Sequence, residues 1–264
     1  MGMAIMTLIP TNYIDLHCHL LPGLDDGPQQ LDESVEMAQQ AVADGIRYIL
    51  ATPHHLDRHY QNAGPIVEHA VTELQAELRQ RKIPLTVFAG QEVHLQDDLA
   101  ASRQHLLGID ACCRYLLLEL PHEFVPDYLD QVVFKLLQQG TIPVIAHPER
   151  NAQIIAQPSR LYDLVQRGCL AQLTAGSLVG RFGHRIKSTS LELIKCGLVQ
   201  VIATDAHFMV GRGFMMRAGY QALARLDDMY PTYFAENARQ LLNGESVALG
   251  ETLRPNQRRK FWLF

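Results

Sequence analysis

Seven short β-rich runs, separated by stretches with helical periodicity, are the feature that most constrains the fold of this chain. The runs are apolar almost throughout, which is typical of strands in a parallel sheet that helices cover on both faces. They occupy residues 12–17, 46–53, 85–92, 115–120, 142–147, 169–175 and 199–204. The first helical pattern begins near Leu31 and ends before Gly45, and the others lie near 65–81, 127–139, 159–167, 184–196, 214–227 and 231–242. Only the link between the third and fourth strands is weakly helical.

Seven strand–helix units in 264 residues predict one domain with a closed or nearly closed α/β barrel. An open, doubly wound sheet is the alternative. No Gly-, Ser- or Pro-rich linker divides the chain. We expect an N-terminal extension over residues 1–11, a single domain over 12–250, and a basic and aromatic tail over 251–264.

The net charge and the cysteine content restrict which partners the protein can have and in which cellular compartment we expect it. A net charge of -5 and a pI near 6.2 predict no nucleic-acid or anionic-membrane partner. The five cysteines form no CxxC pair, and an odd number favours reduced thiols. We find no signal-peptide pattern and no apolar run of the ~18 residues that a membrane span needs, so we expect a cytoplasmic protein.

The first strand ends in two histidines within "YIDLHCHLLPGLDDG". Side chains alternate along a strand, so His17 and His19 should share one face while Cys18 points away. Asp15 should lie on the same face, where its carboxylate could orient an imidazole. An HxH pair alone is weak evidence for a metal site.

The other strand ends strengthen the case, because six of the seven strands finish in a histidine or a carboxylate. In a barrel these ends converge on one face, where active sites are built. An ionised carboxylate in a buried strand, such as Glu119, is costly unless it is paired or metal-bound. The candidate ligands are His17, His19, Asp26, His54, Glu92, Glu119, His147, Asp205 and His207.

Five imidazoles and four carboxylates without a thiolate are typical of Mn²⁺, Fe or catalytic Zn²⁺ rather than of a structural cysteine–zinc site. Nine ligands exceed what one open metal ion uses. We therefore expect two or three ions, with positions left for water and substrate.

Seven motifs in register resemble the polymerase-and-histidinol-phosphatase (PHP) superfamily, and within it the bacterial manganese-dependent protein-tyrosine phosphatases of the CpsB/YwqE type. They are "DLHCH", "DDGP", "TPHH", "GQE", "LLLELP", "IAHPER" and "ATDAH", between Tyr13 and Asn243. The resemblance implies a distorted, TIM-like (β/α)₇ barrel, the PHP fold. It also implies three metal ions held by the nine residues above, with Glu119 as a bridge and with Asp26 chosen because it precedes Gly27.

The resemblance further implies that Arg150 and Arg212 bind the substrate phosphate. It suggests Mn²⁺ as the metal, with Fe, Zn²⁺ or Mg²⁺ as possible substitutes. It implies a role in capsule or exopolysaccharide synthesis, where the partner would be the tyrosine-rich tail of an autokinase. A hydroxide that bridges two metal ions would be the nucleophile, and the metal ions and arginines would stabilise the phosphoryl group.

Two weaker features remain open. The loop "HHLDRHYQNAG" contains Arg58 and Tyr60 and should overhang the site, either as a substrate-recognition lid or as an ordinary solvated loop. The tail "RPNQRRKFWLF" could dock on its own barrel, bind a partner or meet a membrane surface.

Three other functions compete with tyrosine phosphatase activity. The first is a phosphatase for histidinol phosphate or another small ester. The second, amidohydrolase-like cleavage of C–N bonds, normally calls on a lysine ligand, and no lysine stands at a strand end. The third is an inert binding or regulatory domain, which predicts gaps among the ligands. A cysteine-based phosphatase would need a C-x₅-R phosphate cradle, and none of the cysteines begins one.

Overall fold

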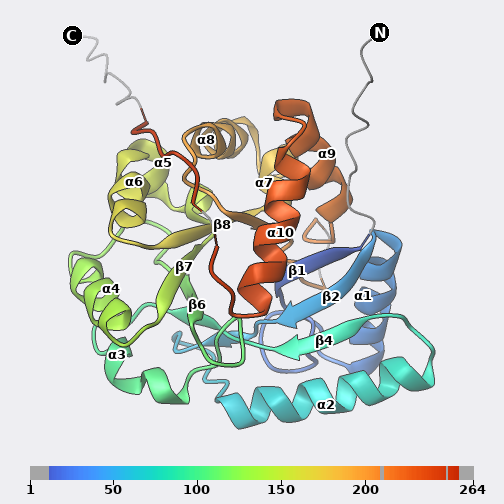
Figure 1. Cartoon of the computed structure of the whole chain (residues 1–264). Helices are drawn as coiled ribbons and strands as arrows, with labels where there is room; N and C mark the ends of the chain where they lie inside the picture. The colour runs from blue at the N-terminus through green and yellow to red at the C-terminus, as the bar shows by residue number, and fades with distance from the viewer. Residues whose placement is uncertain (1–11, 209–210, 248, 256–264) are drawn as a thin grey trace, which may run out of the picture.

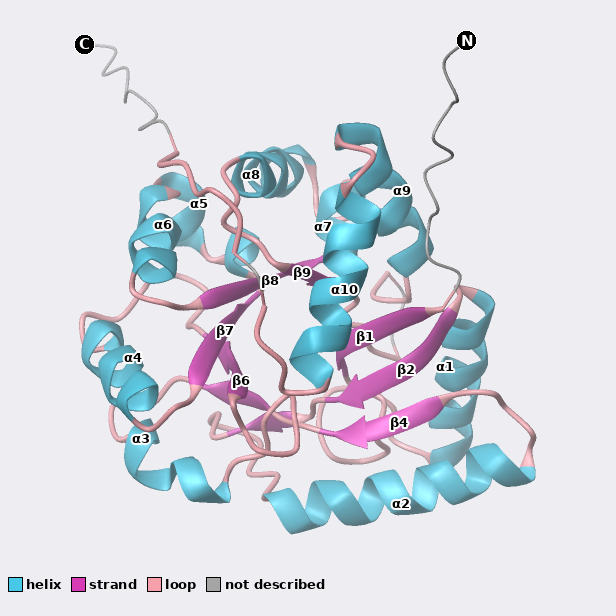
Figure 2. Ribbon diagram, in the orientation of Figure 1, coloured by secondary structure: helices cyan, strands magenta, loops and turns pink. Residues whose placement is uncertain are grey.

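Parallel strands form a barrel with helices around its outside (Figures 1 and 2). This computed structural model describes residues 12–208, 211–247 and 249–255. The strands are β1 (Tyr13–Cys18), β2 (Ile46–Ala51), β3 (His54–His55), β4 (Thr86–Ala89), β5 (Glu92–His94), β6 (Tyr115–Glu119), β7 (Ile142–Ala146), β8 (Leu170–Thr174) and β9 (Val201–Ala203). Every pairing between these strands is parallel.

Two predicted strands are each broken into two pieces, and this break distorts the barrel. The run predicted at 46–53 forms β2 and is followed by the separate β3 at His54–His55, and residues 85–92 contribute to β4 and β5, which gives sheets in the orders β1-β2-β4 and β3-β5-β6-β7-β8-β9. Pro53 lies at the first break and has no N–H for a strand ladder. Gly90 lies at the second, where a Cβ would be 2.7 Å from the Leu50 side chain. The pieces still occupy seven strand positions around the barrel.

The barrel closes where its first and last strands meet. Cys18 forms a parallel bridge with Ala206, and the His19 amide donates to the Ala206 carbonyl at 3.0 Å. The Asp205 amide donates in turn to the His17 carbonyl at 2.8 Å. The predicted seven-stranded barrel is therefore confirmed, and the open sheet is not what forms.

The helices follow the predicted periodicity closely. The seven predicted ones appear as α1 (Leu31–Ala43), α2 (Gly64–Gln80), α4 (Leu129–Gln138), α6 (Ser159–Gln166), α8 (His184–Lys195), α9 (Met216–Leu226) and α10 (Tyr230–Leu242). The short elements missed from the sequence are α3 (Leu99–Ser102), η1 (Arg103–His105), η2 (Pro148–Arg150), α5 (Ala152–Ala156) and α7 (Ala175–Val179). One turn is too short to show a helical period. In the described part of the chain, no helix has both the length and the apolar character to cross a bilayer.

Helix α10 closes the amino-terminal end of the barrel (Figure 2). Its Ala238 and Leu241 belong to a buried cluster with Leu117 and Val144 of the strands. The hydroxyl of Tyr115, the first residue of β6, donates to the Glu245 carbonyl just after α10, at 2.6 Å. With this end filled by apolar side chains, the opposite, carboxyl end is left for polar groups.

The first residues of the predicted tail pack on the barrel's outer helices. The Leu253 amide donates to the Cys196 carbonyl at 2.9 Å, and Arg254 pairs with Asp163 at 2.8 Å and lies over the Tyr162 ring. Residues 256–264 and the predicted extension 1–11 lie outside the described residues. The domain boundaries at 12 and 250 stay a prediction.

The turn that leads into β6 should tolerate no side chain at Gly108. A Cβ there would lie 2.5 Å from the Cys113 Cα and 2.7 Å from the Tyr115 carbonyl oxygen, both backbone atoms. We expect Gly108→Ala to lower the free energy of unfolding by roughly 1–3 kcal/mol in urea denaturation. Gly250→Ala is the control, because nothing lies within 4 Å of its added Cβ. Equal stability of the two variants would contradict this reading.

Candidate metal centre

The carboxyl ends of the strands bring all nine predicted ligands together. The strands β1, β3, β5, β6, β7 and β9 or the residues just after them carry eight, and the loop after β1 carries Asp26. Their ligand atoms form four groups, within each of which all atoms lie within 4.8 Å of one another. The groups are His19–Asp26–His54–His207, His17–His19–Asp205, His17–Glu92–His147 and His54–Glu92–Glu119.

Glu92 lies at the middle of this arrangement. Its side chain is fully buried, with Oε2 3.2 Å from His17 Nε2, 3.3 Å from His19 Nε2 and 3.0 Å from His54 Nδ1. Its other oxygen, Oε1, lies 2.8 Å from His147 Nε2. Glu92 is shared by two of the four groups, whereas Glu119 belongs to one. Glu92 therefore contacts more of the candidate ligands than Glu119 does, and the bridging role that the resemblance implies for Glu119 stays a prediction.

The two neighbouring aspartates have different surroundings. Asp25 is buried, with Oδ2 2.6 Å from His19 Nδ1, and it accepts hydrogen bonds from the amides of Gly27 and His54. Asp26 is 40% exposed in its side chain and lies 3.0 Å from His207 Nε2. Asp25 therefore orients a ligand, while Asp26 faces the cluster, which supports the choice of Asp26.

Gln172 of β8 performs the orienting role that we had expected of Asp15. Its Oε1 lies 2.8 Å from His17 Nδ1, which leaves Nε2 of that ring for the cluster. Asp15 instead accepts hydrogen bonds from the amide and the hydroxyl of Thr204, next to Asp205. Gln172 was missed from the sequence, although a polar residue inside the apolar run "CLAQLTA" could have indicated it. Glu119 was found by the same kind of signal, an acid inside an apolar strand.

Two of the ligand candidates have left-handed backbone conformations. His147 has φ 31° and Asp205 has φ 50°, both at the ends of barrel strands. Side chains with a Cβ rarely adopt this region, and such residues concentrate at functional sites because the surrounding structure must hold them there. With these backbones, His147 Nε2 lies 2.8 Å from Glu92 Oε1, and Asp205 Oδ1 lies 3.4 Å from His19 Nε2.

Charge interactions outweigh burial in setting the pKa values of His54 and Glu92. Burial alone would lower the pKa of His54, but the charge of Glu92 and its hydrogen bond outweigh burial and raise that pKa to about 9. Burial opposes ionisation of Glu92, yet the charges of His17 and His54 hold its pKa well below the usual range. Glu92 is therefore held in its ionised form, which is the form that binds a cation.

The donor atoms fit divalent metal ions. Among the described residues, the buried atoms Glu92 Oε2, His54 Nδ1 and His207 Nε2 lack a hydrogen bond of good geometry. Each instead faces other electron-pair donors of the cluster. Imidazole and carboxylate together suit Mn²⁺, Fe or Zn²⁺. The assignment of the nine residues as ligands remains our proposal.

Both predicted phosphate-binding arginines line the same cavity as the ligands. This cavity has a volume of about 620 Å³. Arg150 pairs with Asp205 Oδ2, and Arg212 donates to both oxygens of Asp205 at 2.8 and 2.9 Å. Arg150 also lies over the ring of Phe182, 5.3 Å from its centroid. Two cations beside one ligand carboxylate form a positive wall at the mouth of the site.

Two residues of the loop after β3, Arg58 and Tyr60, have different places at the site. Arg58 lines the cavity, as expected of a substrate-binding residue. Tyr60 lies beside it with its ring stacked on that of His54, at 6.0 Å between centroids and 12° between planes. Tyr60 therefore packs on a ligand candidate, and the substrate-binding role of both residues stays a prediction.

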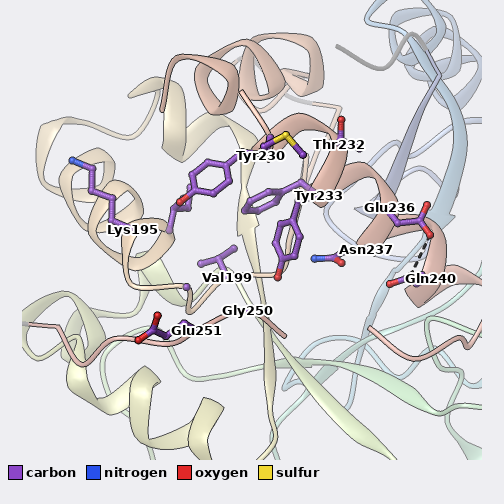
Figure 3. A pocket seen from close by; sticks show the side chains of 14 residues that line it. Lys195, Val199, Tyr230, Thr232, Tyr233, Glu236, Asn237, Gln240, Gly250 and Glu251 are labelled. Carbon is purple, nitrogen blue, oxygen red and sulfur yellow. Dashed lines mark hydrogen bonds between the residues drawn. The ribbon is translucent and has the colours of Figure 1, made fainter. Parts of the chain in front are cut away.

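A second cavity, of about 530 Å³, has a different character. It lies between α8, α10 and the segment around Gly250, and Figure 3 shows its lining of apolar and aromatic side chains such as Tyr230 and Tyr233. Of the described residues that line it, only Glu236 and Glu251 are carboxylates and none is a histidine. It holds no metal-type cluster and is separate from the centre.

Comparison with known proteins identifies the family. The profile of the capsular polysaccharide synthesis family CpsB/CapC matches residues 13–243. The chain belongs to the CpsB/CapC family. It is 40% identical to tyrosine-protein phosphatase YwqE of Bacillus subtilis, over 95% of this chain and 99% of that one. It is 36% identical to the putative tyrosine-protein phosphatase CapC of Staphylococcus aureus, over 91% and 92% of the two chains.

Solved structures agree with this CpsB/CapC membership. One, from a set that covers YwqE of Bacillus subtilis and CpsB of Streptococcus pneumoniae, described as metal-dependent tyrosine phosphatases, is 39% identical and has a TM-score of 0.89. It covers 93% of this chain and 100% of that one. An organophosphorus hydrolase mutant from Deinococcus radiodurans, 12% identical with a TM-score of 0.53 over 92% and 96% of the chains, shares the fold alone. The predicted family is thereby confirmed.

The two aspartates of this CpsB/CapC member should differ when each is replaced. We expect Asp26→Ala to lower the number of Mn²⁺ ions bound per chain and to leave the unfolding midpoint close to the parent's. Asp25→Ala should keep that number, weaken affinity by about 10- to 100-fold and destabilise the fold, because buried hydrogen bonds are lost. Elemental analysis, calorimetry and thermal unfolding measure these effects. Loss of an ion from Asp25→Ala but not from Asp26→Ala would reverse the assignment.

Proposed function

We propose that this protein is a metal-dependent protein-tyrosine phosphatase. The observation that carries the proposal is a cavity lined by six of the nine candidate ligands and by Arg150 and Arg212, with the other three, His17, His19 and His207, clustered beside them. Phosphoryl transfer needs positive charge around the equatorial phosphate oxygens and a positioned nucleophile, and such a cavity can supply both. Relatives named tyrosine-protein phosphatases, which match over nearly the full chain, support the same activity.

We further propose Mn²⁺ as the metal, with two or three ions held by the nine residues. Bound divalent ions would lower the pKa of water toward roughly 7 and would polarise the phosphoryl oxygens. The donor atoms have fixed positions because Glu92, His17 and His54 belong to strands of the packed barrel. Fe, Zn²⁺ and Mg²⁺ remain possible substitutes.

Arg150 and Arg212 would bind the phosphate of the substrate. Both guanidinium groups contact Asp205 in the structure, and a phosphate dianion offers them a second, bidentate partner at the cavity mouth. Phenolate leaves more readily than an alkoxide because the pKa of a tyrosine phenol is about 10. A site with this positive wall therefore suits phosphotyrosine without a strong general acid.

The cysteines do not fit a thiol mechanism. Cys18 is fully buried, and burial raises the pKa of its thiol well above the ordinary value. Burial likewise raises the pKa of Cys169 to about 12. No cysteine is among the described residues that line the cavity. All five are free thiols, which suits a reducing compartment such as the cytoplasm.

The substrate that we propose is a phosphotyrosine protein of capsule or exopolysaccharide synthesis, namely the tyrosine-rich tail of a bacterial autokinase. The family description links the chain to capsular polysaccharide synthesis. Histidinol phosphate is the rival substrate within the same superfamily. An inert regulatory domain is disfavoured, because it predicted gaps among ligands that the structure brings together.

Metal removal should abolish activity. We expect chelated, dialysed protein to lose hydrolysis of a phosphotyrosine peptide and to recover it when Mn²⁺ is added back. Circular dichroism of the chelated protein checks that the fold survives. Unchanged activity in protein shown by elemental analysis to be metal-free would refute the proposal.

The arginines should affect chemistry more than metal content. We expect Arg150→Ala and Arg212→Ala to keep bound Mn²⁺ while kcat/KM on a phosphotyrosine peptide falls by roughly 10²-fold, the loss of a charged contact to the transition state. Arg167→Ala is the matched control, since Arg167 forms an exposed pair with Asp130 away from the cavity. Faster hydrolysis of histidinol phosphate than of the peptide would favour the rival substrate.

A further inference from the structure

One exposed apolar side chain lines the cavity, whose other lining residues are mostly polar or charged. Phe124 is 54% exposed and lines the cavity that holds Arg150 and Arg212. Single exposed apolar residues are ordinary on protein surfaces. Among the described large apolar side chains that are exposed, however, Phe124 is the one that lines this cavity.

The backbone around Phe124 is held firmly in spite of this exposure. The Asn151 side-chain amide donates to the carbonyls of Pro121 at 2.6 Å and Phe124 at 3.0 Å. The Val125 amide donates to Gln153 Oε1 at 2.8 Å. The Ala152 amide also donates to the carbonyl of His122, at 2.7 Å. An exposed aromatic side chain on a fixed backbone can pack against a ligand without first having to order its loop.

The same contacts tie this segment to the phosphate-binding arginine. Asn151 directly follows Arg150 and caps α5, since its Oδ1 accepts from the Ile154 amide at 2.9 Å. One buried side chain therefore fixes both the helix start beside Arg150 and the loop that carries Phe124. The spacing between the phosphate site and the aromatic side chain is set by Asn151.

We propose that Phe124 is the aromatic wall that receives the phenyl ring of the substrate, and that Asn151 is the positioning residue that sets its distance from Arg150. This inference rests on the proposed phosphotyrosine phosphatase function. Phe124 lines the same cavity as both arginines, so a phosphate bound by the arginines and a phenyl ring packed on Phe124 would share that cavity. A phenyl ring would gain an aromatic contact there that an alkyl group lacks.

The test compares a ligand with a ring and one without, on the Mn²⁺-loaded full chain. Phenylphosphonate carries the ring, and inorganic phosphate does not. We expect Phe124→Ala to raise the dissociation constant of phenylphosphonate by about 5- to 10-fold, as an aromatic contact would. Inorganic phosphate should bind as it does to the parent. Calorimetry measures both constants, and KM for a phosphotyrosine peptide should rise with little change in kcat.

The control is Phe134→Ala, which removes an equally exposed phenyl ring from α4 outside the cavity. It should change neither constant. If Phe124→Ala also leaves phenylphosphonate binding unchanged, or weakens both ligands equally, the aromatic wall is refuted. A parent protein that hydrolyses no phosphotyrosine peptide would instead refute the proposed function, so the two failures are distinguishable.

Asn151→Ser tests the positioning role. Serine is also a good helix cap, so the change removes the two donated hydrogen bonds while a capping oxygen remains. We expect Asn151→Ser to weaken phenylphosphonate binding about 3- to 10-fold in the parent and to add nothing further in the Phe124→Ala background. Equal losses in both backgrounds would mean that Asn151 acts on the fold or on Arg150 alone. Thermal unfolding of each variant shows that it is folded.

Discussion

The buried carboxylate of Glu92 is the constraint on which the rest of the structure depends. A fully buried charge is costly unless it is paired, and its two oxygens are met by four imidazoles from other strands. Those imidazoles need carboxylates in turn, which brings Glu119 and Asp205 to the same face. The carboxyl end of the barrel therefore gathers charged groups that pair with one another, whereas the opposite end is filled by the apolar cluster that includes Ala238 and Leu241 of α10.

Residues around the candidate ligands hold those ligands in place. Gln172 fixes the ring of His17, and Asp15 holds the segment before Asp205 through Thr204. His147 and Asp205 have left-handed backbones, a conformation that the surrounding structure must hold in place. Gly27 is needed after the two aspartates, since a Cβ there would lie 2.6 Å from the His19 carbonyl oxygen. Much of the precision of the centre therefore lies in backbone conformation and in residues outside the nine candidate ligands.

The sequence predicted the barrel and the nine clustered residues because both have strong local signals. Apolar runs end in polar residues, and parallel strand ends must meet at one face. It missed the splits at Pro53 and Gly90, since a continuous apolar run does not reveal a change of sheet. It did not show that Glu92 contacts more of the candidate ligands than Glu119 does, because the number of neighbours that a carboxylate touches is a tertiary property. Phe124 gave no signal, because its role depends on a loop held by Asn151, far along the chain.

Closure of the barrel between β1 and β9 has a consequence for how the protein matures. His17 and His19 are made first, while Asp205 and His207 arrive nearly two hundred residues later, so the contacts between them are among the most non-local in the chain. Contacts of this kind form late, after loop-closure entropy has been overcome. A chain still emerging from the ribosome can therefore collect part of the donor set but not the whole. On the proposed ligand assignment, a full centre would form only in a completed fold, and a nascent or truncated chain that ends before β9 would lack part of it.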